Sequence, residues 1–190
     1  MAYSRITGTK NGADAIDYAR GKGKGHNNKK VRNMVIGEVN MLPETVAPYE
    51  EQMRRYWNKA SVKNRNQVRR IVQSFSRREL NPDDRMDIQK ANEIGIEFAQ
   101  RAYTGHQAVV FTQIDGESGL IHNHVLVNNV NMETNYGCSD EQTKFQYVKW
   151  WTNKVAGQYF ELDKGQHTHD KVTQNERRKR QENEKIRKEN

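Results

Sequence analysis

Residues 109–129, VVFTQIDGESGLIHNHVLVNN, decide the fold because they predict a β-hairpin. Two runs rich in β-branched and aromatic residues flank a segment, Asp115 to Gly119, that has the chemistry of a turn. Side chains alternate between the two faces of a strand, so the second run places His122, His124 and Asn128 on one face and aliphatic residues on the other. Two imidazoles on one face are well placed to share a ligand.

The first run of the hairpin adds oxygen donors to the same face. Its alternation groups Gln113 and Asp115, and a tight hairpin brings this amide and carboxylate close to the two histidines. Imidazole, amide and carboxylate together suit a borderline or hard divalent ion that keeps positions open for substrate oxygens. An isolated His-x-His pair is often only a hydrogen-bonded structural feature, so a structural role for His122 and His124 is the alternative.

Length and composition favour one domain followed by a charged tail. A chain of 190 residues is long enough for one good core, and three prolines leave little room for extended linkers. Residues 1–165 are predicted to form the domain. Residues 166–190 are highly charged and are predicted to be a helical or flexible tail that leads to a further C-terminal part of a longer protein.

The chain has the features of a cytoplasmic protein without membrane insertion. Its one cysteine, Cys138, excludes a disulfide framework and fits a reducing compartment. No apolar stretch approaches the roughly 20 residues that span a bilayer, and the N-terminus has no apolar signal-peptide core.

The formal net charge of +8 and the pI near 9.5 indicate a polyanionic partner. Residues 171–190 hold eight Lys and Arg against four Glu, so half of the excess belongs to the tail. The other positive residues cluster at 20–32 and at 63–78. Such clusters are often only solvated surface. Because these two lie beside candidate catalytic segments, they favour a surface that binds the phosphate backbone of a nucleic acid. The residues predicted to bind DNA there are Lys22, Lys24, Lys29, Lys30, Arg69, Arg70, Arg77 and Arg78.

The remaining elements complete an α/β pattern. Strands are predicted at 2–7, 33–40 and 68–76, and helices at 11–20, 47–67, 82–103 and 147–162. Asn11 is a candidate N-cap for the first helix, and Gly21 ends it. This order predicts a two-layer α/β sandwich, a mainly antiparallel sheet with helices covering one side.

Three segments together resemble the relaxases, the mobilisation nucleases of plasmids within the HUH endonuclease superfamily, and of the MOBP-like type. Residues 15–24, AIDYARGKGK, resemble the family's first motif, which implies that Tyr18 is the nucleophile. Residues 70–76, RIVQSFS, are similar to the second motif, whose serine, here Ser74, lies near the DNA around the nick. The hairpin resembles the third motif, H-x-D on one strand and H-x-H-x-x-x-N on the next.

The third motif implies a metal site with one departure from the family pattern. His122, His124 and Asn128 fit the second half of the motif, and Asp115 fits its acid, but Gln113 stands where the family usually has its first metal-binding histidine. Glutamine is an oxygen donor and can complete such a site. The implied ion is Mg²⁺ or Mn²⁺, held by His122, His124 and Gln113, with His106 or His26 as alternative third ligands if the fold brings either one in.

The resemblance implies transesterification on single-stranded DNA at an origin of transfer. Tyr18 would attack the scissile phosphate and form a 5′-phosphotyrosine link, while Asp115 orients a ligand histidine or accepts the proton. Lys22 or Lys24 would help electrostatically, and Asn128 and Ser74 would lie at the DNA. The implied partners are accessory relaxosome proteins and a coupling protein.

Three alternatives remain open from the sequence. A rolling-circle replication initiator or a single-strand transposase also pairs His-x-His with a tyrosine on a downstream helix, which would make Tyr159 the nucleophile. A non-catalytic nucleic-acid-binding module would use the histidines only structurally. A plain soluble α/β domain with a basic tail would bind no DNA.

Overall fold

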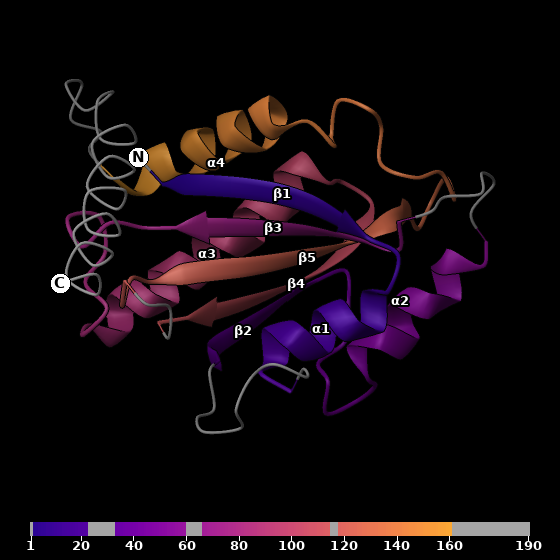
Figure 1. Cartoon of the computed structure of the whole chain (residues 1–190), viewed down its shortest axis with the longest axis horizontal. Coiled ribbons are helices and arrows are strands. Elements are labelled where there is room, and N and C mark those ends of the chain that lie inside the picture. The colour runs from indigo at the N-terminus through magenta and orange to yellow at the C-terminus, as the bar shows by residue number, and fades with distance from the viewer. Residues whose placement is uncertain (1, 23–32, 60–65, 115–117, 161–190) are drawn as a thin grey trace, which may run out of the picture. The chain divides into compact units, whose positions relative to one another are not determined.

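The structure is a computed structural model that describes residues 2–22, 33–59, 66–114 and 118–160 (Figure 1). Residues 1–160 form one compact unit. The predicted tail, 166–190, lies outside the described residues. The elements of the described part are, in order, β1 (Tyr3–Thr9), α1 (Gly12–Arg20), β2 (Asn33–Val39), α2 (Tyr49–Trp57), β3 (Val68–Ser74), α3 (Arg85–Ala102), β4 (His106–Gln113), β5 (His122–Asn131) and α4 (Phe145–Tyr159).

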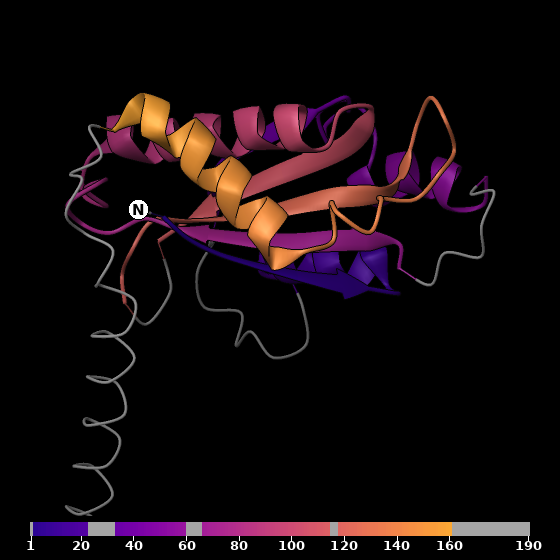
Figure 2. The same cartoon turned by 90° about the horizontal axis from the view of Figure 1, so that it is seen from above.

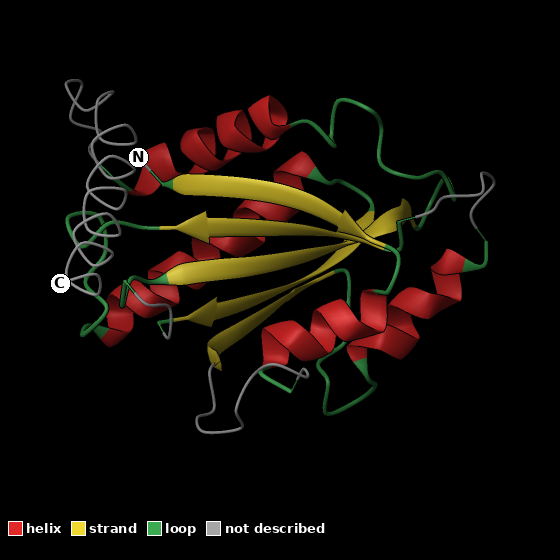
Figure 3. Ribbon diagram, viewed as in Figure 1, coloured by secondary structure: helices red, strands yellow, loops and turns green. Residues whose placement is uncertain are grey.

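The five strands form one antiparallel sheet in the order β1-β3-β5-β4-β2, as Figure 3 shows. The predicted hairpin is confirmed, because β4 pairs with β5 in a register that sets Gln113 opposite His122 and Phe111 opposite His124. β5 is the central strand, and its other neighbour is β3, where Ser74 also lies opposite His122. The histidine strand is therefore fixed from both sides.

Helices cover both faces of the sheet, which corrects the prediction of helices on one side only. The larger core cluster joins α3 and α4 to residues such as Val110 and Val125, and a second cluster joins α1 and α2 to Phe111 and Leu126. Figure 2 shows α3 and α4 on one side of the sheet and α1 on the other. The reason lies in β4, where successive apolar residues such as Val110 and Phe111 point to opposite faces and both need cover.

The predicted limits of α1 are confirmed, and local chemistry explains them. The Asn11 side chain caps α1 by accepting from the backbone N–H of Asp14, and Gly21 ends the helix in the left-handed region at φ 82°. The helix α3 begins at Arg85 rather than at Pro82, because Asp84 is its N-cap and accepts from the N–H of Met86.

The second helix is shorter than predicted. α2 ends at Trp57, and Gln67, predicted as its last residue, instead donates its backbone N–H to the carbonyl of Thr9, the last residue of β1. No helix in the described ranges is both long enough and apolar enough to cross a membrane.

Candidate active site

The two histidines lie on a part of the sheet that α1 and α2 leave uncovered. We call this surface the open face, and it is made of exposed or half-buried side chains on one side of three neighbouring strands. In Figure 1 the sheet is seen from the side that α1 and α2 partly cover. Farther along the same side, Leu126 and Phe111 are fully buried under α1 and α2. The open face consists of Tyr3, Arg5 and Thr7 of β1, Arg70, Val72 and Ser74 of β3, and His122 and His124 of β5.

Tyr18 lies at the border of this open face, beside the histidines. Its side chain is 43% exposed, and its ring meets the His124 ring edge to face, with centroids 6.3 Å apart. The His122 and His124 rings are 5.2 Å apart, and the Arg70 guanidinium lies 5.1 Å from the centre of the Tyr18 ring. The structure thus brings together a phenol, two imidazoles and a cation that are up to 106 positions apart in the sequence.

The packing of α1 explains why Tyr18 points toward the histidines. Ile16 and Ala19 turn inward and join the second core cluster, so Tyr18 lies on the side of the helix that borders the open face. Gly12 lets the start of α1 approach α2, since a Cβ there would come within 2.5 Å of the Trp57 ring. The predicted proximity of Tyr18 to His124 is therefore present, and its role as the nucleophile stays a prediction.

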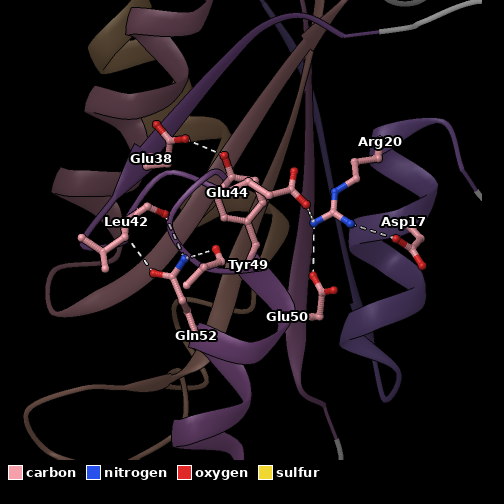
Figure 4. A network of polar contacts seen from close by, with 9 residues as sticks. Asp17, Arg20, Glu38, Leu42, Glu44, Tyr49, Glu50 and Gln52 are labelled. Carbon is pink, nitrogen blue, oxygen red and sulfur yellow. Dashed lines mark hydrogen bonds and ion pairs between the residues drawn. The ribbon is translucent and has the colours of Figure 1, made fainter.

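Arg20 anchors the end of α1 through a network of ion pairs with nearby carboxylates (Figure 4). Its side chain is only 8% exposed and forms ion pairs with Asp17 and Glu50 at 3.1 Å and with Glu44. The guanidinium also lies over the Tyr49 ring. This network ties α1 to α2 two residues after Tyr18, so it holds the helix that carries the phenol.

We expect the substitution Arg20→Met to destabilise the fold. It removes the positive charge that pairs with Asp17, Glu44 and Glu50, at a cost of about 2 kcal/mol in the free energy of unfolding, less than for a fully buried pair because the carboxylates are partly exposed. Urea unfolding at pH 7 measures the change. The matched control is Arg101→Met, which breaks the more exposed Arg101–Glu97 pair and should change the free energy by about 0.5 kcal/mol or less. Equal effects of the two substitutions would contradict this role of Arg20.

The donor atoms around the histidines fit a divalent metal. Nδ1 of His122 lies 3.0 Å from the Leu120 carbonyl, an arrangement that orients the ring, and Nε2 is the ring nitrogen that would ligate a metal. Gln113 donates its side-chain N–H to the Ala19 carbonyl, and its amide oxygen is a donor type that suits a hard divalent cation. Within the described ranges no group of three or more His, Cys, Asp or Glu side chains is placed to hold a metal. The candidate set is two imidazoles and one amide oxygen, and Asp115, predicted to assist them, lies outside the described residues.

His106 is not an alternative third ligand. It lies at the other end of β4, opposite Asn131, whereas Gln113 at the near end is opposite His122. It is buried, and its Nδ1 is 2.9 Å from the Asn128 carbonyl. The other alternative, His26, falls outside the described residues.

The buried position of His106 predicts a loss of stability in acid. Burial lowers the pKa of His106 from its ordinary value, so the unfolded chain binds the proton more readily than the folded chain. This contribution to stability is complete above about pH 6.5 and is lost as the pH falls below that value. Urea midpoints between pH 7.5 and 5.5 should therefore fall more steeply for the native chain than for His106→Gln. Parallel curves for the two proteins would contradict the prediction.

Several predicted DNA-binding residues lie where DNA can reach them. Arg70 and Ser74 are half buried on the open face, whereas Lys22, Arg77 and Arg78 are exposed in the segments that follow α1 and β3. Arg77 lies 3.9 Å from Asp83, at the limit of an ion pair between two exposed side chains. Lys24, Lys29 and Lys30 fall outside the described residues.

Two predicted DNA-binding residues lie away from the open face. Arg69 alternates with Arg70, so its side chain lies on the opposite side of the sheet, where it donates to the Asn129 side chain at 2.7 Å. Asn128 shares the histidine side of β5 but is fully buried under α2, and it donates to the Met53 carbonyl and the Gln107 side chain. Both residues have structural roles in this arrangement.

Tyr159, the alternative nucleophile, lies on the wrong side of the sheet. It belongs to α4, which packs on the face opposite the histidines. Its hydroxyl donates to Glu97 at 2.8 Å, and burial with this carboxylate raises the pKa of Tyr159 to about 12. A phenol that ionises less readily than normal, and that lies a sheet away from the histidines, is poorly suited to attack a phosphate there.

A buried polar network supports the histidine strand from behind. Asn123, which lies between the two histidines and points to the opposite face, donates to Gln73 at 3.1 Å and accepts from Thr112 at 2.8 Å. Gln73 donates in turn to Thr152 of α4, and Asn92 of α3 donates to Thr112. All five side chains are buried, so the network links three strands and two helices and fixes the orientation of β5.

The prediction from the sequence did not include the β1 part of the open face. Tyr3, Arg5 and Thr7 are exposed there, while Ala2, Ser4 and Ile6 turn toward the other face. The alternation was visible in the sequence, but only the pairing of Tyr3 with Ser74 shows that β1 lies next to the site.

The comparisons with known proteins agree on one family. A model for the relaxases, described as a MobA/VirD2-like nuclease domain, matches residues 18–159. Two relatives, each named protein rlx and each from Staphylococcus aureus, are 28% identical over 147 residues and 25% identical over 159 residues. These regions cover 76% and 84% of this chain but 39% and 44% of the relatives. The chain thus spans about two-fifths of the length of these relatives.

Solved structures show the same fold. A Mn-bound MobM relaxase domain in complex with oriT DNA of plasmid pMV158 aligns with a TM-score of 0.59 and 16% identity, over 88% of this chain and 90% of that one. The conjugative relaxase TrwC, in a metal-bound complex with oriT DNA, aligns with a TM-score of 0.51 and 10% identity, over 84% of this chain and 69% of that one.

Proposed function

The chain belongs to the relaxases with a MobA/VirD2-like nuclease domain, and from this premise we propose that it nicks one DNA strand at an origin of transfer through Tyr18. The nick would start the conjugative transfer or mobilisation of a plasmid in the cytoplasm, with accessory relaxosome proteins and a coupling protein as partners. Support comes from the MobM and TrwC structures, both of which hold oriT DNA.

One observation carries the proposal. The Tyr18 ring lies against His124 and beneath Arg70, on a surface that is open to solvent. A phenol, two imidazoles and a guanidinium therefore lie close together on this surface, and these groups suit the roles of nucleophile, metal ligands and cation toward a phosphodiester of an unpaired strand. A tyrosine that served only the core would be buried, whereas Tyr18 is 43% exposed.

The proposed reaction is an exchange of one phosphodiester for another. The Tyr18 oxygen bonds to phosphorus, the bond from phosphorus to the 3′ oxygen breaks, and the released oxygen takes up a proton as a 3′ hydroxyl. An ordinary phenol has a pKa near 10, so attack at neutral pH needs a base or a cation close by. Arg70 supplies the cation over the ring, and we propose that Asp115 accepts the phenolic proton.

His122, His124 and Gln113 would hold Mg²⁺ or Mn²⁺ beside this phosphate. The bound ion would supply Lewis-acid stabilisation of the charge that develops on a nonbridging oxygen. Ser74, opposite His122, and Arg70, next to Tyr18, would contact the DNA backbone, with Lys22, Lys24, Lys29, Lys30, Arg77 and Arg78 extending the positive surface. Binding through such contacts should weaken steeply as the salt concentration rises.

The test starts from a labelled pool of single-stranded DNA with an internal random segment, incubated with the protein and Mn²⁺. We expect a protein–DNA product that survives SDS, requires the metal and disappears with EDTA. Sequencing of the captured strands then gives the cut site for a defined oligonucleotide. Salt-sensitive binding without any covalent product would instead support a non-catalytic DNA-binding module.

A further inference from the structure

The edge strand β1 carries an exposed tyrosine, Tyr3. It lies in the same cross-strand row as His122, one of the two candidate metal ligands. Tyr3 is 51% exposed and lies opposite Ser74, which lies opposite His122 on the next strand. Directly opposed residues of an antiparallel pair point to the same side, so the Tyr3 ring rises from the open face. Two strand spacings of roughly 4.8 Å put the Tyr3 backbone only about 10 Å from that of His122.

The surroundings of Tyr3 suit a nucleotide. Arg5, two residues along β1, is exposed on the same side and lies opposite Val72 in the row that contains His124. Thr7 follows opposite Arg70. An aromatic ring with a flanking guanidinium is the combination that binds unpaired DNA, because the ring stacks on a base while the cation meets a phosphate.

The position of Tyr18 decides which nucleotide this is. Attack on a phosphodiester sets the entering and leaving oxygens roughly in line, on opposite sides of phosphorus. Tyr18 contacts His124 and Arg70, so it approaches from the end of the open face where Leu126 becomes buried. Tyr3 lies in the row of His122, one step farther from Tyr18 along the strands. The leaving 3′ oxygen and its nucleotide therefore lie toward Tyr3.

We propose that Tyr3 and Arg5 form a binding subsite for the nucleotide on the 3′-hydroxyl side of the nick. Tyr3 stacks on its base, and Arg5 pairs with the adjoining phosphate. This inference rests on the proposed nicking function, since the side of the nick is defined by Tyr18. It adds β1 to the DNA-binding surface and makes it the part that holds the released end for rejoining.

The test measures DNA affinity in a Tyr18→Phe background, so that the oligonucleotide stays intact, and compares Tyr3→Ala with Tyr3→Trp. Loss of one stacked base should weaken binding roughly 10-fold in Tyr3→Ala, and Tyr3→Trp should bind like the parent. Tyr136, which is 60% exposed in the loop after β5, supplies the matched control Tyr136→Ala, expected to have no effect.

The DNA is varied in parallel. An abasic residue on the 3′-hydroxyl side of the nick should weaken parent binding by a similar factor and abolish the difference between the parent and Tyr3→Ala. An abasic residue on the 5′-phosphate side should leave that difference intact. The subsite would be overturned if Tyr3→Ala and Tyr136→Ala bound DNA equally well. It would also be overturned if the abasic residue on the 5′-phosphate side, and not the one on the 3′-hydroxyl side, abolished the difference between the parent and Tyr3→Ala. Failure of the native protein to form any covalent product would overturn the nicking function itself, and this is measured separately with Tyr18 in place.

Discussion

Replacing Tyr18 with phenylalanine is expected to abolish the covalent protein–DNA product, with a fall in its rate on the order of 10³-fold or more. The substitution removes only the oxygen that we propose attacks the phosphate. The ring stays, and with it the edge contact to His124 and the cation over its face, so the site keeps its shape. DNA affinity should change by less than about 3-fold, since the hydroxyl is a single polar group at an exposed position. Capture of a labelled oligonucleotide on an SDS gel measures the first quantity, and fluorescence anisotropy measures the second.

Tyr159→Phe is the matched control for this result. It removes the same atom from a tyrosine on the opposite face, where the lost hydrogen bond to Glu97 affects stability and not the site. Its covalent product should form at the native rate. Product that persists in Tyr18→Phe and disappears in Tyr159→Phe would transfer the nucleophile to α4 and favour the replication-initiator or transposase alternative.

The features that the sequence predicted well depend on neighbours within about ten residues. The hairpin follows from two β-branched runs around a turn segment, and the limits of α1 follow from Asn11 and Gly21. Alternation along β5 correctly set His122 and His124 on one face. These signals are local, because a cap or a strand face is decided by the residues next to it.

The features that the sequence could not predict depend on partners far along the chain. Arg20 and Arg70 both belong to the positive clusters in the sequence, yet Arg20 is buried by carboxylates of the α2 region while Arg70 lies over Tyr18. Asn128 shares its strand face with the histidines and differs only in that α2 covers it. The prediction of helices on one side of the sheet failed for the same reason, because long-range contacts decide on which side of a sheet a helix packs.

Replacing His122 with alanine is the second large effect that we expect, with the rate of covalent product falling about 10²- to 10³-fold at a fixed low Mn²⁺ concentration. One of the two proposed imidazole ligands is lost, so the metal should bind more weakly and stabilise the charge on the phosphate oxygen less. Raising Mn²⁺ to millimolar levels should recover part of the rate. His122 is a cleaner target than His124, because His124 also contacts the Tyr18 ring and its removal disturbs the nucleophile as well.

Metal binding must be measured apart from activity for this result to be decisive. Calorimetric titration with Mn²⁺ should show tight binding to the native protein, at least 10-fold weaker binding to His122→Ala, and native binding to His106→Gln, whose histidine lies at the far end of the same strand pair. DNA affinity should remain within a few-fold of native in both variants, because neither side chain is a major cationic contact. If His122→Ala bound Mn²⁺ like the native protein, the two imidazoles would be structural and the cation would have to be held elsewhere on the chain. If it lost Mn²⁺ but kept the full rate of covalent product, the reaction would need only Tyr18 and the cations around it.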